Sequence, residues 1–393
     1  MSQQLINLNL DLKRLRDDGY EIEIKGGHLF AHHIPYLNSS LKIKYGTIVT
    51  VLSLINPNII GTPPDHTVYF SGEVPYNKDG QPLNAIILSS NDLQLSPTIL
   101  VNHHFSSRPT TGNYPSYFEK IRTYIEILSS QAKFIESKVS AKTFKVIPDT
   151  DEESVFHYID TNSSRANIEM INTKFENQKI AIIGLGGTGS YILDLVAKTP
   201  VAEIRLYDND VFQQHNAYRS PGVPSIKKLN SQPKKVKYFS SIYSKLHKYI
   251  KPYAVRITEK NLHLLKGLSF VFICIDKNEA RALIISKLIK LGIPFIDVGL
   301  GVNFAENNLM GTIRVTVGTS SKKDHINNRI GKEDIGENDY STNIQIADLN
   351  ALNAAFAVVK WKKLTGFYQD LKEEHNILYS INTGQVINDD YKT

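Results

Sequence analysis

The residues best suited to chemistry begin with a glycine-rich loop. The stretch GLGGTGS at 184–190 stands between an apolar run, IAII, and the helical pattern YILDLVAK. Glycines in such a turn let the backbone approach phosphate oxygens, and the following helix N-terminus offers N–H donors and a favourable dipole. The candidate contacts are Gly184, Gly186, Gly187 and Gly189. The loop predicts a nucleotide site, but it fits the pyrophosphate of NAD as well as the triphosphate of ATP.

Further polar residues follow the loop in order. Asp208 closes a second apolar strand pattern, where a carboxylate would bind ribose hydroxyls, and Asp210 comes two residues later. An Asn-x-x-Arg sequence, two adjacent lysines and an aspartate at the end of a later strand complete the set: Asn216 and Arg219, Lys234 and Lys235, and Asp276. Lys235 is preferred over Lys234 because the helical pattern begins with KV, but both stay candidates. Each residue alone fits a loop or surface role, so the prediction depends on the set.

The elements that must position these residues alternate between strand and helix from about residue 166. Strands are expected at KIAII, AEIRLYD, YAVRITEK, SFVFICID and IPFIDVGLG, with helices between them. Continuous apolar strands of this kind indicate a parallel sheet with helices on both faces. A long amphipathic helix near 347–366 is expected to turn Leu349, Leu352, Phe356 and Val359 inward. The predicted fold class is α/β: a Rossmann-like, doubly wound, mainly parallel sheet over 151–393, preceded by a smaller α+β domain over 1–150.

The ordered set resembles the ThiF/MoeB (HesA/MoeB/ThiF) superfamily, which includes the adenylation domain of ubiquitin-activating enzymes. The resemblance covers about 165–370 and includes the glycine loop, Asp-x-Asp, Asn-x-x-Arg, the helix-opening lysine and the later aspartate. It implies an ATP-dependent adenylyltransferase that joins a carboxylate to the α-phosphate of ATP and releases pyrophosphate, with Mg²⁺ as a second cofactor. Two anionic groups must meet in this reaction, so cations are needed.

The resemblance also implies roles for individual residues. Arg219 and Lys235 would contact the phosphates, Asn216 would orient them, Asp208 would take the ribose, and Asp276 would hold Mg²⁺. Arg165 lies just before the first strand, where members of the family place a further arginine contributed by a partner subunit. An ordinary surface arginine explains Arg165 equally well, so both interpretations stay open.

The implied substrate is the C-terminal carboxylate of a ubiquitin-like protein ending in glycine, as for bacterial ThiF proteins encoded beside ubiquitin-like partners. The alternatives are adenylation of a short peptide in natural-product maturation, a nucleotide-binding scaffold, and an NAD-dependent oxidoreductase. The resemblance further implies a homodimer, with a conjugating-enzyme-like protein as a possible second partner. Residues 1–150 loosely resemble a ubiquitin-conjugating fold, but they contain no cysteine. Such a domain could only dock a partner or dimerise.

The single cysteine, Cys274, limits how an acyl-adenylate could be passed on. It lies in the apolar run FVFICID, where a cysteine behaves as a small hydrophobic residue. A thioester on a conventional loop cysteine and a CxxC zinc site are therefore excluded. Direct transfer or an ester on a hydroxyl remains, and the candidates for an ester lie in loop 318–343: Thr319, Ser320, Ser321, Ser341 and Thr342. Ester formation is chemically allowed because an adenylate is a good leaving group.

The composition is that of an ordinary globular protein. The chain has 393 residues, 41% hydrophobic and 21% charged, with a net charge of +6. Its lysine clusters are typical of solvated faces, so no nucleic-acid partner is expected. No apolar run reaches the length of a membrane span and no secretory signal is recognisable, so a cytoplasmic location is expected. The pairs His32–His33 and His103–His104 are assigned structural roles, because neighbouring strand residues point to opposite faces.

Overall fold

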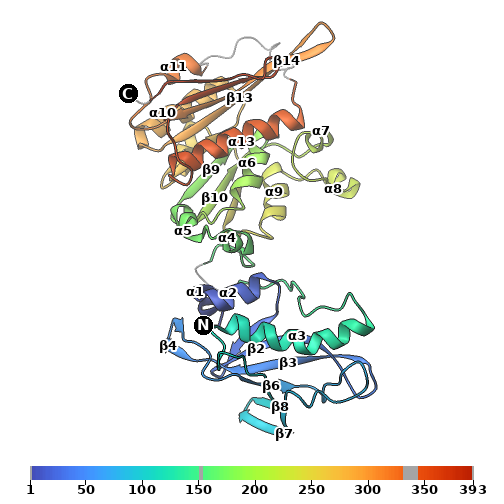
Figure 1. Cartoon of the computed structure of the whole chain (residues 1–393). Helices are drawn as coiled ribbons and strands as arrows, with labels where there is room; N and C mark the ends of the chain where they lie inside the picture. Colours follow the sequence, from blue (N-terminus) through green and yellow to red (C-terminus); the bar gives the residue numbers. More distant parts are fainter. Residues whose placement is uncertain (1, 150–153, 331–343, 392–393) are drawn as a thin grey trace. The chain divides into compact units, whose positions relative to one another are not determined.

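The computed structural model describes residues 2–149, 154–330 and 344–391. These residues form two compact units (Figure 1). The N-terminal unit comprises Met1–Pro148 and Asp160–Ala166, and the C-terminal unit comprises Asp149–Ile159 and Asn167–Thr393. The chain therefore leaves the first unit, contributes a short segment to the second, returns, and then enters the second unit for good.

The N-terminal unit is built on one antiparallel sheet. Its six strands lie in the order β1 (Ile22–Lys25), β2 (His28–Leu37), β3 (Ile43–Val51), β6 (Thr67–Ser71), β8 (Ile99–Ser106) and β7 (Ile87–Ser96). A small hairpin, β4 (Leu54–Asn56) and β5 (Ile59–Ile60), stands apart from this sheet. The helices of the unit are α1 (Ser2–Leu8), α2 (Leu10–Asp17), α3 (Tyr117–Ile135) and α4 (Thr161–Ala166). An α+β arrangement follows.

Helix α3 covers one face of this sheet. Ser116 caps it by accepting a hydrogen bond from the Glu119 N–H, as polar residues at this position commonly do. One apolar face of this helix is buried, and its members are Phe118, Ile121, Tyr124, Ile125 and Leu128. These side chains join those of β2 and β3 in one hydrophobic core.

The C-terminal unit is built on an eight-stranded mixed sheet. Its order is β11 (Ile250–Tyr253), β10 (Glu203–Tyr207), β9 (Lys179–Ile183), β12 (Phe270–Ile273), β13 (Phe295–Ala305), β14 (Asn308–Gly318), β15 (Asn376–Ser380) and β16 (Val386–Asp389). The five strands from β11 to β13 are parallel. The strands from β14 to β16 continue the sheet in antiparallel pairing. The predicted α/β class with a mainly parallel sheet is confirmed, and the antiparallel extension is a feature that the sequence patterns did not indicate.

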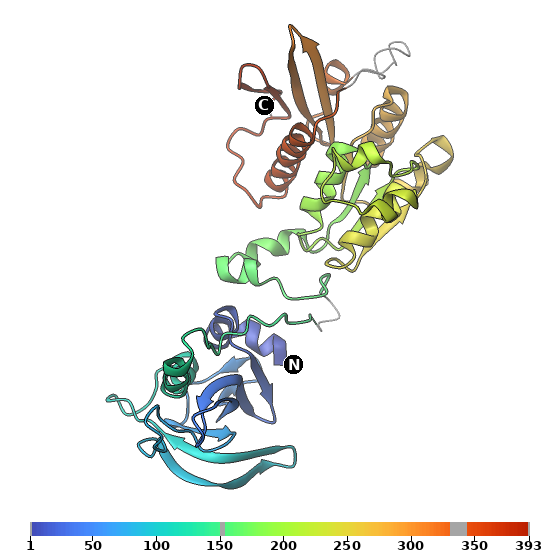
Figure 2. The same cartoon turned by 90° about the vertical axis from the view of Figure 1, so that its right-hand side faces the viewer.

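Helices cover both faces of this sheet. The helices described in this unit are α5 (Glu169–Asn172), α6 (Gly187–Val196), α7 (Gln214–Ala217), α8 (Ile226–Asn230), α9 (Lys235–Tyr243), α10 (Asn278–Leu291), α11 (Ile326–Arg329) and α13 (Ala347–Leu364), with 3₁₀ turns η1 (Thr173–Phe175) and η2 (Glu259–Leu265). Helices α5 and α8 bury no side chain. Helices α6, α9 and α13 share one core with the strands, and α10 and η2 share the core of the other face. In Figure 2, β13 and β14 stand between α13 and α10.

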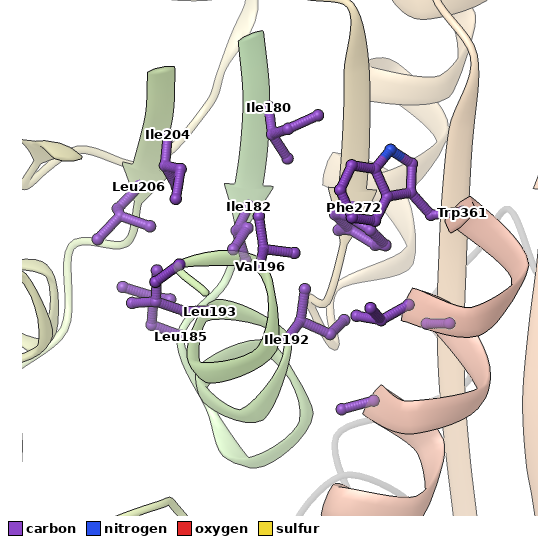
Figure 3. Packing of buried hydrophobic residues seen from close by; sticks show 14 of the residues in the cluster. Ile180, Ile182, Leu185, Ile192, Leu193, Val196, Ile204, Leu206, Phe272 and Trp361 are labelled. Carbon is purple, nitrogen blue, oxygen red and sulfur yellow. The ribbon is translucent and has the colours of Figure 1, made fainter. Parts of the chain in front are cut away.

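The two cores together explain why the strands are continuous apolar runs in the sequence. Figure 3 shows α6 lying against β9 and β10, with Phe272 and Trp361 beside them. Strand residues alternate between the two cores: Ile180 and Ile182 face α6, whereas Ala181 and Ile183 face α10. Both faces are buried, as expected for the parallel part of a doubly wound sheet.

The predicted inward face of α13 is partly wrong. Leu352 and Val359 are 36% and 43% exposed, while Asn350, Asn353, Ala354, Ala357 and Trp361 are buried. The reason is the close approach of α6. A Cβ added at Gly187 would lie 2.2 Å from the Asn350 side chain, so this contact admits only small or hydrogen-bonding groups. Helix α13 therefore turns its small residues inward, and some of its larger aliphatic residues remain at the surface.

Candidate nucleotide-binding site

A cavity of about 620 Å³ lies at the carboxyl ends of the parallel strands. Ligands of open α/β sheets bind at this edge because the loops after the strands converge there. The structure brings most of the predicted site residues into its lining: Gly184, Gly186, Gly187, Asp208, Asp210, Arg219, Lys235 and Asp276. All lining residues belong to the C-terminal unit.

Three of the loop glycines differ in what a side chain would meet at their positions. Gly184 has a φ of +90°, and a Cβ there would lie 2.4 Å from the Cys274 carbonyl oxygen. A Cβ on Gly189 would lie 2.0 Å from the carbonyl oxygen of Gly184, so these two glycines are required by the packing of the loop. A Cβ on Gly186 would meet nothing within 4 Å. Gly186 caps α6 without a side-chain hydrogen bond, which leaves an approach to the first N–H groups of the helix.

Asp208 is first of all a support for the glycine loop. One of its carboxylate oxygens accepts the Leu185 N–H at 2.7 Å and the other accepts the Asp210 N–H at 2.8 Å. The side chain is buried at the edge of the cavity. Each oxygen keeps a second lone pair. The geometry shows a structural role for Asp208, and its predicted contact to a ribose stays a prediction.

The two adjacent lysines are separated clearly by the structure. Lys235 is nearly buried and lines the cavity, with its Nζ 2.8 Å from Asp210 and 3.8 Å from Asp208. Lys234 donates instead to the carbonyl oxygen of Asn209 at 2.7 Å. Burial raises the pKa of Asp210, but the hydrogen bond and charge of Lys235, followed by Arg256 and Lys234, outweigh it and hold that pKa below its usual value. Of the two lysines, only Lys235 therefore lines the cavity, and its predicted contact to phosphate stays a prediction.

Arg219 presents an unsatisfied donor near the cavity. Its Nε is buried and has no hydrogen-bond partner in the described part of the chain. Burial lowers the pKa of its guanidinium, and the negative charge of Asp276 opposes this shift. Asp276 is itself exposed in the cavity wall just after β12. A buried guanidinium N–H without an acceptor is costly, and an anionic ligand would satisfy it.

Asn216 acts on the loop that carries Arg219. Its Oδ1 accepts the Gln213 N–H at 2.9 Å, and its backbone carbonyl accepts the Arg219 N–H at 3.1 Å. Asn216 is buried and is not part of the cavity lining. The structure therefore shows it orienting the turn between α7 and Arg219. The predicted contact to phosphate stays a prediction.

The remaining predicted residues are not brought into the cavity lining. Arg165 is exposed on α4 of the N-terminal unit and donates to the Asp17 carbonyl oxygen. The Thr319 hydroxyl accepts the Lys322 N–H at 3.0 Å and lies 3.1 Å from the Ser321 hydroxyl. Ser320 is exposed in the same turn. Ser341 and Thr342 lie outside the described residues.

Cys274 lies one residue beyond β12 and lines the cavity. Burial raises the pKa of its thiol well above the usual range, and the nearby Asp297 carboxylate adds to this effect. The thiolate is the nucleophilic form of cysteine, so this residue is inert at neutral pH. No group of three or more His, Cys, Asp or Glu side chains among the described residues is arranged to hold a metal. His103 contacts Ser90 Oγ and the Gly72 carbonyl, both at 3.0 Å.

Sequence reasoning missed three arginines of the cavity wall, Arg256, Arg281 and Arg314. It also missed Asp297, the carboxylate between Arg281 and Arg314. Two signals could have found them. Asp297 is a charge inside the apolar strand FIDVGL, and a buried charge needs a partner. Arg281 stands in the first turn of a helix, where the dipole disfavours a cation.

Two families match the chain. Residues 164–319 match the ThiF family, and residues 10–161 match a domain of unknown function, DUF6791. The adenylyltransferase and sulfurtransferase UBA4 of Saccharomyces cerevisiae is 28% identical over 135 residues, which span 33% of this chain and 29% of the yeast protein. The ubiquitin-like modifier-activating enzyme 5 of Drosophila ananassae is 20% identical over 156 residues, or 37% of this chain and 39% of that protein. The similarity thus spans well under half of either relative.

Solved structures show a weak likeness. The microcin C7 biosynthetic enzyme MccB in complex with N-formylated MccA has a TM-score of 0.48 at 17% identity, covering 59% of this chain and 70% of that one. Escherichia coli MccB with ATP has a TM-score of 0.47 at 18% identity, covering 73% and 83%. In the described part of the chain, none of the helices has the length and apolar character needed to cross a membrane.

Proposed function

We propose, from the premise that this chain belongs to the ThiF/MoeB superfamily, that its C-terminal unit is an ATP-dependent adenylyltransferase acting on a carboxylate. The observation that carries the proposal is the pair of cations at the cavity. Lys235 is nearly buried beside two carboxylates, and Arg219 keeps a buried Nε–H without an acceptor. A triphosphate supplies the anionic acceptors that such a pair requires.

Adenylation explains this charge arrangement better than hydride transfer does. Attack of a carboxylate on the α-phosphate brings two anions together, and fixed cations lower the cost of that approach. A dinucleotide needs the glycine loop and a ribose contact, but its chemistry makes no use of a lysine and an arginine at the phosphates. An NAD-dependent oxidoreductase would give Arg219 and Lys235 no role in its reaction.

The residues present also fit a magnesium ion. Mg²⁺ takes one or two carboxylates together with phosphate oxygens and retains several waters. Asp276 offers an exposed carboxylate in the cavity, within electrostatic range of Arg219. Asp276 would hold the ion, which would supply charge neutralisation at the triphosphate. The protein's own part is to hold the nucleotide between the glycine loop, Arg219 and Lys235.

The substrate we propose is the C-terminal carboxylate of a ubiquitin-like protein, because the two relatives are named for such chemistry or for adenylyl transfer. Adenylation of a short peptide is the alternative. The product would pass to its acceptor without a cysteine ester, since the Cys274 thiol stays protonated. An ester on Thr319, Ser320 or Ser321 is a further candidate. Treatment of the product with hydroxylamine followed by mass spectrometry tests that ester, and finding no adduct on any residue contradicts it.

The experiment for the proposed function is exchange of labelled pyrophosphate into ATP by the full chain. A ubiquitin-like protein ending in glycine and a short peptide serve as the two acyl donors. Exchange that requires the ubiquitin-like protein supports the proposal. Exchange with the short peptide but not with the ubiquitin-like protein favours the alternative. ATP binding without exchange by either donor favours a nucleotide-binding scaffold. Asp276→Ala and Arg219→Ala should each abolish the exchange.

A further inference from the structure

One carboxylate in the C-terminal unit is completely buried within the sheet. Asp297 lies on β13 with no exposed surface. Its Oδ1 is 2.9 Å from the Nε of Arg281, and its Oδ2 is 2.6 Å from Nη2 of Arg314. Each oxygen therefore lies within ion-pair distance of its own arginine, one from α10 and one from β14, although the contact between Oδ1 and Arg281 Nε does not have hydrogen-bond geometry. Burying three charged groups together is expensive and is weak evidence for a gain in stability.

Arg281 uses its other nitrogen atoms on the segment that carries Asp276. Its Nη1 donates to the Asn278 side-chain oxygen, and its Nη2 donates to the Ile275 carbonyl oxygen. Ile275 immediately precedes Asp276, and Asn278 follows it by two residues. Arg281 thus ties both sides of Asp276 to a carboxylate that is fixed in the sheet. Its place in the first turn of α10 opposes the helix dipole, so helix stability does not account for it.

Arg314 completes the network from the antiparallel side. Its Nη1 donates to the Thr316 hydroxyl, and that hydroxyl donates to Asn376 on β15 at 2.8 Å. Contacts therefore run from β15 through Arg314, Asp297 and Arg281 to the segment around Asp276. Through these contacts the antiparallel extension of the sheet supports one side of the nucleotide cavity.

We propose that Arg281 and Asp297 are positioning residues that fix the Asp276 carboxylate for the divalent cation accompanying ATP, with Arg314 holding Asp297 in place. This inference rests on the proposed function. Groups that orient a metal ligand without touching the metal commonly change metal affinity by about 10- to 100-fold when removed. If the network only stabilised the fold, its removal would not selectively change the part of the ATP affinity that depends on Mg²⁺.

The test is calorimetric titration of the full chain with ATP, once in EDTA and once in saturating Mg²⁺. The ratio of the two affinities measures what the cation contributes. In Arg281→Lys and Asp297→Asn we expect the metal-free ATP affinity to stay at the wild-type value and the Mg²⁺-dependent gain to fall about tenfold or more. Because these buried changes can weaken folding, Asn278→Ala provides a milder third variant, and thermal unfolding checks each protein.

Arg205→Lys is the matched control. Arg205 also pairs with a carboxylate, Glu203, and donates to a backbone carbonyl, that of Leu264, but it does not line the cavity. Its Mg²⁺-dependent gain should equal that of the wild type. A wild-type gain in folded Arg281→Lys or Asn278→Ala overturns the inference while leaving the proposed function intact. Failure of the wild-type chain to bind ATP in either buffer overturns the proposed function, and this inference with it.

Discussion

Two buried cationic side chains, one from each unit, differ in how their hydrogen-bond donors are satisfied. In the N-terminal unit, Lys120 is fully buried on α3, and its Nζ donates to the Thr50 hydroxyl, the Asp65 carbonyl and the Asp65 carboxylate. In the C-terminal unit, Arg219 keeps a buried Nε–H without an acceptor among the described residues. An ammonium has three donors, so Lys120 is satisfied by the fold alone. A cation with all its partners supports a structure, whereas a cation with a spare donor at a cavity marks a place for an anion.

The largest effect that follows from this contrast is on stability. Lys120→Ala removes a long buried side chain and leaves three acceptors without their donor. We expect a loss of about 4 kcal/mol in the free energy of unfolding of the N-terminal unit. Hydrogen exchange read by mass spectrometry reports the two units separately. ATP affinity should not change, and a loss of ATP binding in folded Lys120→Ala would break the contrast.

Acid should act on the C-terminal unit through His247. Its Nε2 lies 2.9 Å from the Val201 carbonyl oxygen and its Nδ1 accepts the Tyr249 N–H at 3.2 Å, so the ring is neutral. Burial lowers the pKa of His247 to about 4 from 6.5. His247 therefore becomes protonated below about pH 6.5 in the unfolded chain, but only near pH 4 in the folded chain. Stability contributed by this group is full above pH 6.5 and falls by up to about 3 kcal/mol as the pH drops to 4.

The control for this acid effect is His247→Gln, which cannot titrate. Urea unfolding of the C-terminal unit at several pH values between 7 and 4 gives the slope for both proteins. The variant should lose stability less steeply than the wild type over that range. Equal slopes would show that His247 does not bind its proton as the buried geometry implies.

A smaller effect separates the two lysines at the cavity. Lys235→Ala removes the cation that lies beside Asp208 and Asp210, and we expect ATP affinity to fall about 10- to 100-fold, or about 1.4–2.7 kcal/mol. Lys234→Ala is the matched control, since Lys234 does not line the cavity and its Nζ donates to the Asn209 carbonyl oxygen. Its effect should stay within about twofold. Similar losses in both variants would show that charge near the site matters more than position.

The smallest expected change in stability comes from Gly186→Ala. The added Cβ meets no atom within 4 Å, so the free energy of unfolding should stay within about 0.5 kcal/mol of the wild-type value. The methyl group would nonetheless stand where a phosphate approaches the start of α6. We expect weaker ATP binding with unchanged urea unfolding. Unchanged affinity would place the phosphates elsewhere in the cavity.

Local patterns in the sequence predicted the parts of the site that lie within one element or its adjoining loop. The glycine loop follows β9 directly, Asp208 follows β10, and Asp276 follows β12 closely, so a strand pattern and the polar residue after it were enough. The cluster of Arg281, Asp297 and Arg314 could not be predicted in this way, because its members come from three elements. Pairing of β13 with β14 brings Asp297 and Arg314 together, and packing of α10 against the sheet adds Arg281.

Two further misses have the same physical origin. The parallel strand at the edge of the sheet, β11, is Ile250–Tyr253, whereas YAVRITEK was predicted. Pairing with β10 rather than local β-propensity sets its position. On α13 the predicted face included Leu352 and Val359, but contact with Gly187 of α6 selects the face with Asn350 and Ala354. Periodicity shows that a helix is amphipathic, while the shape of its neighbour decides which residues fit.

The most direct test of the central claim is a titration of the full chain with ATP and with NAD in Mg²⁺, repeated for Arg219→Ala and Lys235→Ala. The account predicts that the wild type binds ATP at least about tenfold more tightly than NAD, because only the triphosphate reaches both cations. It also predicts that each substitution removes most of this preference. Tighter binding of NAD, or an ATP affinity that neither substitution changes, would contradict the assignment of the cavity to ATP.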